Sequence, residues 1–291
     1  MDLDLAQLRA LDATVTAGTL DGAARALHLT PSAISQRLKA LEAAAGRVLL
    51  VRSRPVQVTE SGQAVLRLAR QIALLTADAT RELEGEDGDR PVTLPIAVNA
   101  DSMATWVLPA LAPLAAELSF DLHREDQEHT TALLRDGRVM AAITAAAEPV
   151  PGCTVTRLGA MPYRPMATPA FRARWFPDGV TTDALTRAPV VVFDRRDDLQ
   201  HRYLRRRGVD VGVPPVHHVP ASADYLLAVE LGFGWGMVPR QQEPPGGLVG
   251  LDPDGGVDVV LYWQQWKLRS PTLDRAAAAV LDAARRALDQ H

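Results

Sequence analysis

A short helix, a tight turn and a second, strongly capped helix start lie within the first half-hundred residues, and this order of features constrains the fold most. Residues 23–27 predict a short helix that breaks at His28. Thr30 and Pro31 start another helix, because threonine is a good N-cap and proline lacks only an N–H that would be free there anyway. We expect this helix to end at Ala45. The pattern predicts a helix-turn-helix.

Two further elements complete a small N-terminal domain. Leucines spaced by three predict a preceding helix over residues 4–18, and the apolar runs at 48–51 and 55–58 predict a small β-wing. Residues 25–58 hold six basic residues and one acid, although the 291-residue chain has a net charge of −4. A basic face of this kind favours a nucleic-acid partner.

The helix that begins at Pro31 has a polar face. At 100° per residue, Ser32, Gln36 and Lys39 lie opposite its apolar side. Hydroxyls, an amide and a cation are the groups that contact bases and phosphates in the major groove, although any surface helix has a polar side. The candidate residues for binding double-stranded DNA are Thr30, Ser32, Ser35, Gln36, Arg37, Lys39, Arg52 and Arg54.

A long helix is predicted over residues 59–84. Val65, Leu68, Ile72 and Leu75 recur at alternating steps of three and four, which is typical of a helix that pairs with a second copy of itself. We expect a homodimer, with a homotetramer left open. Residues 85–91 are rich in acid and glycine and predict a hinge.

Residues 92–291 alternate between apolar runs and helical patterns. This alternation predicts mainly parallel sheets with helices on both faces, and a region of this length favours two small α/β lobes. Ligands of such sheets bind beyond the carboxyl ends of the strands. The predicted strands are 92–98, 120–122, 140–144, 155–158, 189–193, 216–219, 235–238 and 257–263, and the predicted helices are 103–117, 130–137, 197–207, 223–231 and 272–288.

Polar residues recur where these strands end. Ser102 begins a helix whose free N–H groups would attract a carboxylate, and Asp101 beside it could bind an ammonium group, although both residues could simply cap the helix. Acids at several strand ends favour a cationic ligand over an anionic one, the alternative being solvated acidic loops. The candidate effector-binding residues are Asn99, Asp101, Ser102, Glu125, Thr144, Asp194 and Asp224.

Other chemistries find little support. Cys153 is the only cysteine, so it cannot form a disulfide within the chain, and it has no histidine nearby in sequence to make it a nucleophile. His217 and His218 point to opposite sides of a strand and have no third ligand at a suitable spacing. We therefore expect no metal, no cofactor and no enzymatic activity. No apolar stretch approaches the roughly 18 residues of a membrane span, and we expect a cytoplasmic protein.

Residues 23–42 resemble the helix-turn-helix signature of LysR-type transcriptional regulators. Within that family, residues 96–106, 158–165 and 188–194 resemble the ArgP/LysG branch. The resemblance implies a winged helix-turn-helix, a dimerising linker helix and an effector domain of two lobes like those of periplasmic binding proteins. It also implies a response to lysine or arginine and control of the export or metabolism of basic amino acids. His28 is a departure, since glycine is common in this turn.

The predicted fold class is therefore an α+β winged helix-turn-helix domain at residues 1–58, a linker helix at 59–84, a hinge at 85–91 and an α/β effector domain at 92–291. The predicted function is sequence-specific transcriptional regulation in response to a basic amino acid. Two alternatives stay open at this point. One is a less specific, architectural or replication-origin DNA-binding protein, and the other is a small-molecule enzyme built on an α/β lobe.

Overall fold

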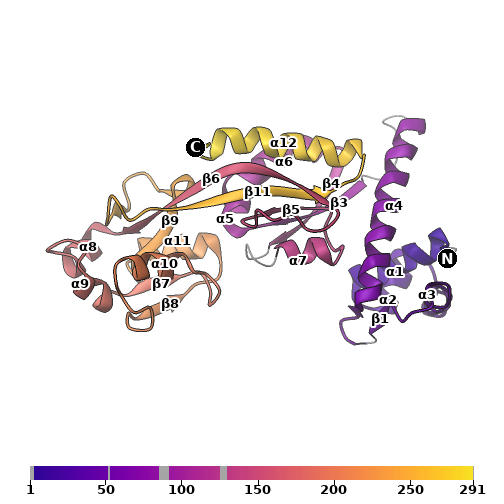
Figure 1. Cartoon of the computed structure of the whole chain (residues 1–291), viewed down its shortest axis with the longest axis horizontal. Helices are drawn as coiled ribbons and strands as arrows, with labels where there is room; N and C mark the ends of the chain where they lie inside the picture. The colour runs from indigo at the N-terminus through magenta and orange to yellow at the C-terminus, as the bar shows by residue number, and fades with distance from the viewer. Residues whose placement is uncertain (1–2, 52, 85–91, 125–129, 291) are drawn as a thin grey trace.

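The computed structural model describes residues 3–51, 53–84, 92–124 and 130–290. A helical domain at the N-terminus adjoins a long helix, and a two-lobed domain lies beside that helix (Figure 1). The predicted hinge at 85–91 lies outside the described residues.

The N-terminal domain is the predicted winged helix-turn-helix. Its elements are α1 (Leu5–Ala17), α2 (Leu20–Ala26), α3 (Pro31–Ala45), β1 (Leu50–Val51) and β2 (Gln57–Val58). The hydroxyl oxygen of Thr30 accepts a hydrogen bond from the backbone N–H of Ala33, as expected of an N-cap. Apolar side chains of all three helices, including Leu11, Ile34 and Leu41, form one core. The wing strands are shorter than predicted.

His28 occupies the turn between α2 and α3. Its φ angle is 53°, and it is the only non-glycine residue with a positive φ among the described residues. The backbone N–H of Leu29 then reaches back to the carbonyl of Ala24 at 2.8 Å. The turn therefore has the left-handed geometry that glycine usually provides, with histidine in that place.

Helix α4 (Glu60–Glu84) is the predicted linker helix, but its apolar residues do not all face one partner. Val65 is only 9% exposed because it packs into the core of the N-terminal domain, so the prediction that it pairs with a second helix is wrong in this structure. Leu68 and Leu75 are 37% and 40% exposed, and Ile72 packs partly against the same core as Val65. Leu68 and Leu75 are therefore the two predicted interface residues that stay exposed.

The effector domain contains one large sheet and one small one. The large sheet has the order β10-β6-β11-β5-β3-β4, with β9 also paired to β6, and the small one pairs β7 with β8. The strands are β3 (Val92–Val98), β4 (Leu118–Arg124), β5 (Ala141–Thr144), β6 (Cys153–Ala167), β7 (Val190–Val192), β8 (Val216–His218), β9 (Gly236–Pro239), β10 (Val249–Gly250) and β11 (Val257–Trp266).

The prediction of mainly parallel sheets is wrong for the large sheet. Only β3 pairs in parallel, with β4 and β5, whereas β6 and β11 form a long antiparallel pair. Strand β6 is 15 residues long and continues well past the predicted end at 158. Gly159, Pro162 and Pro165 interrupt the β pattern in the sequence, but pairing with β11 and β9 carries the strand through them.

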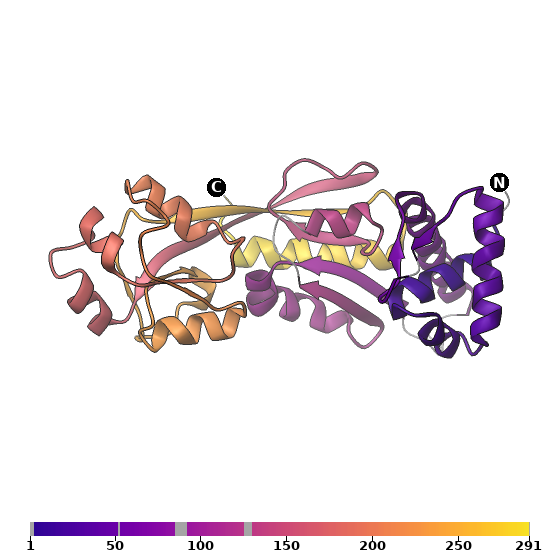
Figure 2. The ribbon, with the colours of Figure 1, turned by 90° about the horizontal axis from the view of Figure 1, so that it is seen from below.

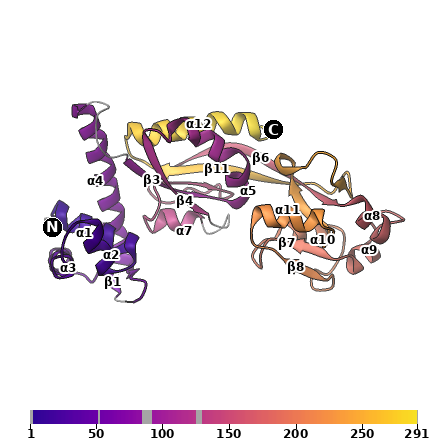
Figure 3. The same cartoon turned by 180° about the vertical axis from the view of Figure 1, so that it is seen from behind.

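The helices distinguish the two lobes. They are α5 (Ala100–Ser102), the π-helical turn Met103–Val107, α6 (Leu108–Leu111), α7 (Thr130–Arg135), α8 (Pro169–Trp175), α9 (Thr182–Arg187), α10 (Leu199–Arg206), α11 (Ser222–Glu230) and α12 (Pro271–Ala287). Lobe 1 contains β3, β4 and β5. In this lobe, α6 and α12 cover one face of the sheet and α7 covers the other (Figures 1 and 3). Lobe 2 contains α8 to α11, and β6 and β11 run through both lobes (Figure 2).

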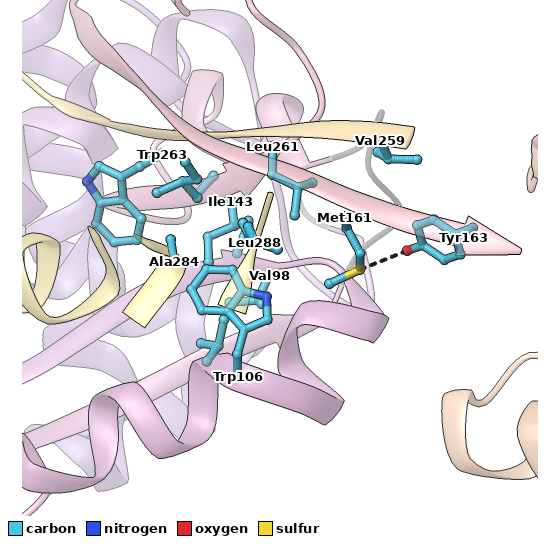
Figure 4. Close-up of a cluster of buried hydrophobic side chains, with 14 of the residues drawn as sticks. Val98, Trp106, Ile143, Met161, Tyr163, Val259, Leu261, Trp263, Ala284 and Leu288 are labelled. Atoms are coloured by element: carbon cyan, nitrogen blue, oxygen red, sulfur yellow. Dashed lines mark hydrogen bonds between the residues drawn. The ribbon is translucent and has the colours of Figure 1, made fainter. Parts of the chain in front are cut away.

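The core of lobe 1 lies between the sheet and its helices. Trp106 and Trp263 are 6% and 2% exposed and pack among aliphatic side chains from β3, β5 and β11 (Figure 4). Trp235 is fully buried in the same continuous cluster, against the ring of Tyr203. Trp106 and Trp235 are therefore core residues.

Candidate functional site

A cleft of about 450 Å³ lies between the two lobes. Lobe 1 lines it mainly with residues at or just after the ends of its strands, and lobe 2 lines it mainly with the turn between β7 and α10 and with residues of α10. The lining residues are Asn99, Ala100, Asp101, Arg124, Ala145, Phe193, Asp194, Arg196, Asp197, Asp198, Leu199, Arg202, Pro220 and Val259. The cleft is at the carboxyl ends of β3, β4, β5 and β7, as predicted for strands of this type.

Asp101 joins the two lobes across this cleft. Its Oδ2 accepts a 2.7 Å hydrogen bond from the hydroxyl of Tyr163 on β6, and its Oδ1 accepts a 2.9 Å bond from the hydroxyl of Ser222 on α11. Gln242 donates in turn to the oxygen of Ser222. Burial raises the pKa of Asp101, and the two hydroxyl donors partly oppose that shift.

Asp194 and Asp197 shape the turn after β7. Oδ1 of Asp194 accepts hydrogen bonds from the backbone N–H groups of Arg196 and Asp197. Asp197 accepts bonds from the backbone N–H groups of Phe193 and Leu199. Burial raises the pKa of Asp197 to about 6 despite these bonds, and the charges of Asp101 and Asp194 add to the rise. The turn therefore presents desolvated negative charge to the cleft, which a cation would neutralise.

Three arginines also line the cleft. Arg124 ends β4 in lobe 1, whereas Arg196 and Arg202 belong to lobe 2. Within the described residues none of the three forms a salt bridge. Both signs of charge thus reach the same cleft, which suits a zwitterion better than a simple cation.

Asn99 has a buried amide without a partner. The residue is 2% exposed, and neither its Oδ1 nor its Nδ2 has a hydrogen-bond partner among the described residues. The hydroxyl of Ser102 and the indole nitrogen of Trp106 are buried and unpaired in the same sense. Buried polar groups are rarely left unpaired, so an amide of this kind at a cleft indicates a place for a ligand.

Three other predicted ligand residues, Thr144, Ser102 and Asp224, do not line the cleft. Thr144 is buried, and its hydroxyl accepts a hydrogen bond from the backbone N–H of Ala146. Ser102 is fully buried, and Asp224 is exposed on α11. Glu125 lies outside the described residues.

Sequence reasoning missed Asp197 and the three cleft arginines. Asp197 follows Asp194 by three residues in a turn that contains both acids and arginines, and the sequence of such a turn does not show which acid is desolvated. The arginines come from separate elements and meet only in the folded chain. Arg124 is the last residue of β4, but the predicted strand ended at 122, so its place at a strand end was not visible in the sequence.

The predicted DNA-binding residues lie together on the N-terminal domain. Ser32, Gln36, Lys39 and Thr30 are exposed on or next to α3, and Arg54 is exposed in the wing. Ser35 and Arg37 are partly buried at the edges of the same face. Arg52 lies outside the described residues. The face is available to a duplex, and its side chains carry the chemistry that α3 needs in a major groove.

The part of the chain that the structure describes contains neither a cluster of metal-binding side chains nor a candidate membrane-spanning helix. No three His, Cys, Asp or Glu side chains there come close enough together to bind a metal ion. None of its helices combines the length and the apolar character that crossing a membrane requires.

Two family descriptions match the chain. Residues 5–63 match the bacterial regulatory helix-turn-helix protein of the lysR family, and residues 88–288 match the LysR substrate binding domain. The chain belongs to the LysR family. The winged domain and the two-lobed domain found in the structure are therefore the two parts of a LysR-type regulator.

Several relatives match over nearly the full length. The HTH-type transcriptional regulator LysG of Mycobacterium tuberculosis (strain ATCC 25618 / H37Rv) is 42% identical over 97% of this chain and 94% of its own. The lysine export transcriptional regulatory protein LysG of Corynebacterium efficiens is 43% identical over 93% of this chain and 94% of its own.

Solved structures agree with the sequence relatives. The crystal structure of ArgP from Mycobacterium tuberculosis has a TM-score of 0.86 and 41% identity, with both chains fully covered. Full-length LysG from Corynebacterium glutamicum, solved with bound effector Arg, has a TM-score of 0.76 and 38% identity, covering 98% of this chain and 99% of that one. This LysR-family chain is thus similar to the ArgP and LysG regulators in both sequence and fold.

Proposed function

We propose that this LysR-family protein is a sequence-specific DNA-binding transcriptional regulator whose DNA binding responds to lysine or arginine. The main support is the desolvated carboxylate of Asp197 in a cleft that also contains an unpaired, buried Asn99 amide. A related regulator has been solved with bound arginine, and other relatives are named for lysine export.

The cationic end of the ligand is assigned to the turn after β7. Asp197 and Asp194 lie in that turn, and the buried Asp197 carboxylate gains most from a neutralising ammonium or guanidinium group. Asp101 is a weaker candidate than the sequence indicates, because two hydroxyl groups already donate to its two oxygens.

The α-carboxylate is assigned to Asn99 and to the three cleft arginines, of which Arg124 is in the same lobe as Asn99. An Arg–carboxylate pair can form two parallel hydrogen bonds and is stronger than a neutral contact. The earlier assignment to Ser102 is replaced, since that residue does not line the cleft.

The remaining assignments follow from the same proposal. Ser32, Gln36 and Lys39 contact the major groove, and Arg54 contacts the backbone beside it. Subunits pair through Leu68 and Leu75 as a homodimer or homotetramer. We propose no cofactor and no enzymatic activity, because the relatives are named as transcriptional regulators. A cytoplasmic location follows from the need to reach the chromosome.

Calorimetry on the purified full-length protein tests the ligand. Lysine, arginine and norleucine are compared, since norleucine keeps the α-amino and carboxylate groups but lacks the side-chain cation. A charge-assisted hydrogen bond contributes roughly 1.5 to 3 kcal/mol, so lysine or arginine should bind about tenfold to a hundredfold more tightly than norleucine. Equal binding of all three, or no binding of any, would reject a basic amino acid as effector.

A second measurement separates specific regulation from architectural DNA binding. The affinity for a duplex selected by the protein from a random library is compared with that for bulk DNA at the same salt concentration. A specific regulator should prefer the selected duplex by about a thousandfold or more. A ratio near one would favour the architectural alternative.

A further inference from the structure

Arg70 of α4 contacts two domains at once. Its Nε donates a 2.7 Å hydrogen bond to Oδ1 of Asp12 and its Nη2 donates to the hydroxyl of Thr16 at 3.3 Å, and both acceptors are on α1 of the DNA-binding domain. Its Nη1 donates a 2.6 Å hydrogen bond to the carbonyl of Gly137 in the effector domain. The Arg70 side chain is only 12% exposed. One guanidinium group therefore joins the DNA-binding domain to the effector domain of the same chain.

Arg67 strengthens the effector side of this contact. It precedes Arg70 by three residues, so both side chains are on one face of α4. Its Nη1 donates a 2.5 Å hydrogen bond to the carbonyl of Arg135, the last residue of α7, and its guanidinium is 5.3 Å from the ring centroid of Trp266. Two cations thus bind the carbonyl end of α7, where the helix dipole is negative.

Gly137 makes this approach possible. Its φ is +68°, and a Cβ added to it would lie 2.1 Å from Cγ of Arg67. Both the backbone conformation and the lack of space require glycine. The turn after α7 is therefore shaped for close contact with α4.

The same turn connects to the effector cleft through buried strands. Met140, three residues after Gly137, donates its backbone N–H to the carbonyl of Pro95 in β3 at 2.9 Å. Strands β5 and β3 then pair in parallel and lead directly to Ala145 and Asn99, which both line the cleft. The cleft and the Arg70 contact are thus at opposite ends of the same two paired strands.

We propose that Arg70 is the residue through which the effector domain and the DNA-binding domain influence each other. The contact fixes the DNA-binding domain against its own effector domain, and a ligand that moves β3 and β5 changes DNA affinity by changing that contact. The part that concerns the ligand rests on the proposed function above. Because coupling between two sites is reciprocal, DNA binding must in turn alter the turn after α7, where Arg70 contacts the effector domain.

The first test needs no effector. Hydrogen exchange of residues 131–141 is measured in the full-length protein with and without the duplex selected from the random library. Wild type should show a DNA-dependent change in these residues, and Arg70→Gln should lose it. Arg81→Gln is the matched control, because Arg81 is on the same helix and donates to Thr272 of the effector domain but has no described contact with the DNA-binding domain.

Asp12→Ala is the second variant, since Asp12 is partly exposed and its change removes the charged acceptor on the DNA-binding side while the effector side stays intact. It should reproduce the loss even if Arg70→Gln folds poorly. A DNA-dependent change that persists in Asp12→Ala or in folded Arg70→Gln would overturn the proposal, as would its absence from wild type.

The second test includes the effector. The ratio of duplex Kd values with and without 10 mM lysine or arginine should be at least about fivefold in wild type and Arg81→Gln, within the usual range of coupling between sites. In Arg70→Gln it should fall below about twofold, while the calorimetric affinity for the amino acid stays unchanged. A full ratio in Arg70→Gln would contradict the proposal. If neither amino acid binds wild type, the proposed effector fails, and the exchange experiment still decides the role of Arg70.

Discussion

The hydroxyl of Tyr163 donates a 2.7 Å hydrogen bond to Oδ2 of Asp101, so the strand that passes between the lobes holds an acid at the edge of the cleft. The bond favours the ionised acid and partly opposes the effect of burial on its pKa. Tyr163→Phe should therefore raise the pKa of Asp101 further. Because the ionised acid gains more from this bond than the protonated acid does, the loss of unfolding free energy should be about 1 to 3 kcal/mol at pH 8 and smaller at pH 4, close to the ordinary pKa of 3.8.

Denaturant unfolding at the two pH values measures this difference. Tyr262→Phe is the control, since the Tyr262 hydroxyl has no hydrogen bond within the described residues. An equal loss at both pH values would mean that Tyr163 contributes packing only.

We expect the Asp197 carboxylate to destabilise the protein without ligand and to strengthen the binding of a basic amino acid. Its folded pKa of about 6 is above the ordinary value of 3.8, so the folded state binds the proton more tightly than the unfolded state does. Stability without ligand should therefore fall as pH rises from about 4 to 6. At pH 7.5, Asp197→Asn should unfold with a free energy that is higher by up to about 3 kcal/mol, and it should bind lysine or arginine at least about tenfold more weakly.

Thermal and denaturant unfolding measure the change in stability, and calorimetry measures the change in ligand affinity. Asp258→Asn is the control, because Asp258 is exposed. A variant that loses stability at pH 7.5 and keeps full ligand affinity would show that Asp197 serves the turn alone.

Gln36 and Lys39 should have different effects on DNA binding. Both are exposed on α3, but an amide can read a base whereas a lysine mainly neutralises phosphate. Gln36→Ala should reduce the preference for the selected duplex by about 1 to 3 kcal/mol. Lys39→Ala should weaken all duplexes alike and lower the salt dependence. Fluorescence anisotropy over a salt series distinguishes the two, and unchanged selectivity in Gln36→Ala would place that residue outside the base contacts.

Leu68 and Val65 provide a test of the subunit interface. Leu68 is 37% exposed on α4 and Val65 is 9% exposed within the DNA-binding core. Leu68→Asp should split dimers while the monomer stays folded, whereas Val65→Asp should unfold the N-terminal domain, because a buried carboxylate costs several kcal/mol. Sedimentation at low micromolar concentration and circular dichroism measure the two effects. A dimeric Leu68→Asp would exclude this part of α4 from the interface.

His28 should be a site of stabilisation. A non-glycine residue in the left-handed region costs roughly 1 to 2 kcal/mol, of which glycine's larger unfolded-state entropy offsets about half. His28→Gly should therefore raise the unfolding free energy by about 0.5 to 1 kcal/mol. His28→Ala keeps the Cβ and should gain nothing. Urea unfolding compares the three, and a less stable His28→Gly would show that the imidazole stabilises the turn.

Local patterns predicted the N-terminal domain well. The Thr30 cap, the Gly46 end and the spacing of Ile34, Leu38 and Leu41 each depend on neighbours within one helix, and the structure confirms them. The heptad pattern was less informative, because an apolar residue such as Val65 can serve either a second subunit or the core of its own domain. Sequence spacing does not distinguish the two.

The cleft could be predicted only in part, because much of it is formed by contacts between residues that are distant in the sequence. Asn99 and Asp194 were found because they directly follow strands, and both line the cleft. The desolvation of Asp197 results from how lobe 2 packs, and the hydrogen bonds of Asp101 come from residues 62 and 121 positions away. No local pattern in the sequence contains that information.

The course of β6 and β11 has a consequence for how such regulators can change over evolutionary time. Because the chain enters lobe 2 along β6 and returns along β11, lobe 2 is an insertion that interrupts lobe 1, and both of its ends lie in strands that pair with each other almost throughout. Recombination between genes could exchange the helix-turn-helix as one block, but exchanging a single lobe would require two simultaneous crossovers inside a hydrogen-bonded strand pair. New ligand preferences should therefore arise by point substitution within the cleft, and new operators by replacement of the whole N-terminal domain.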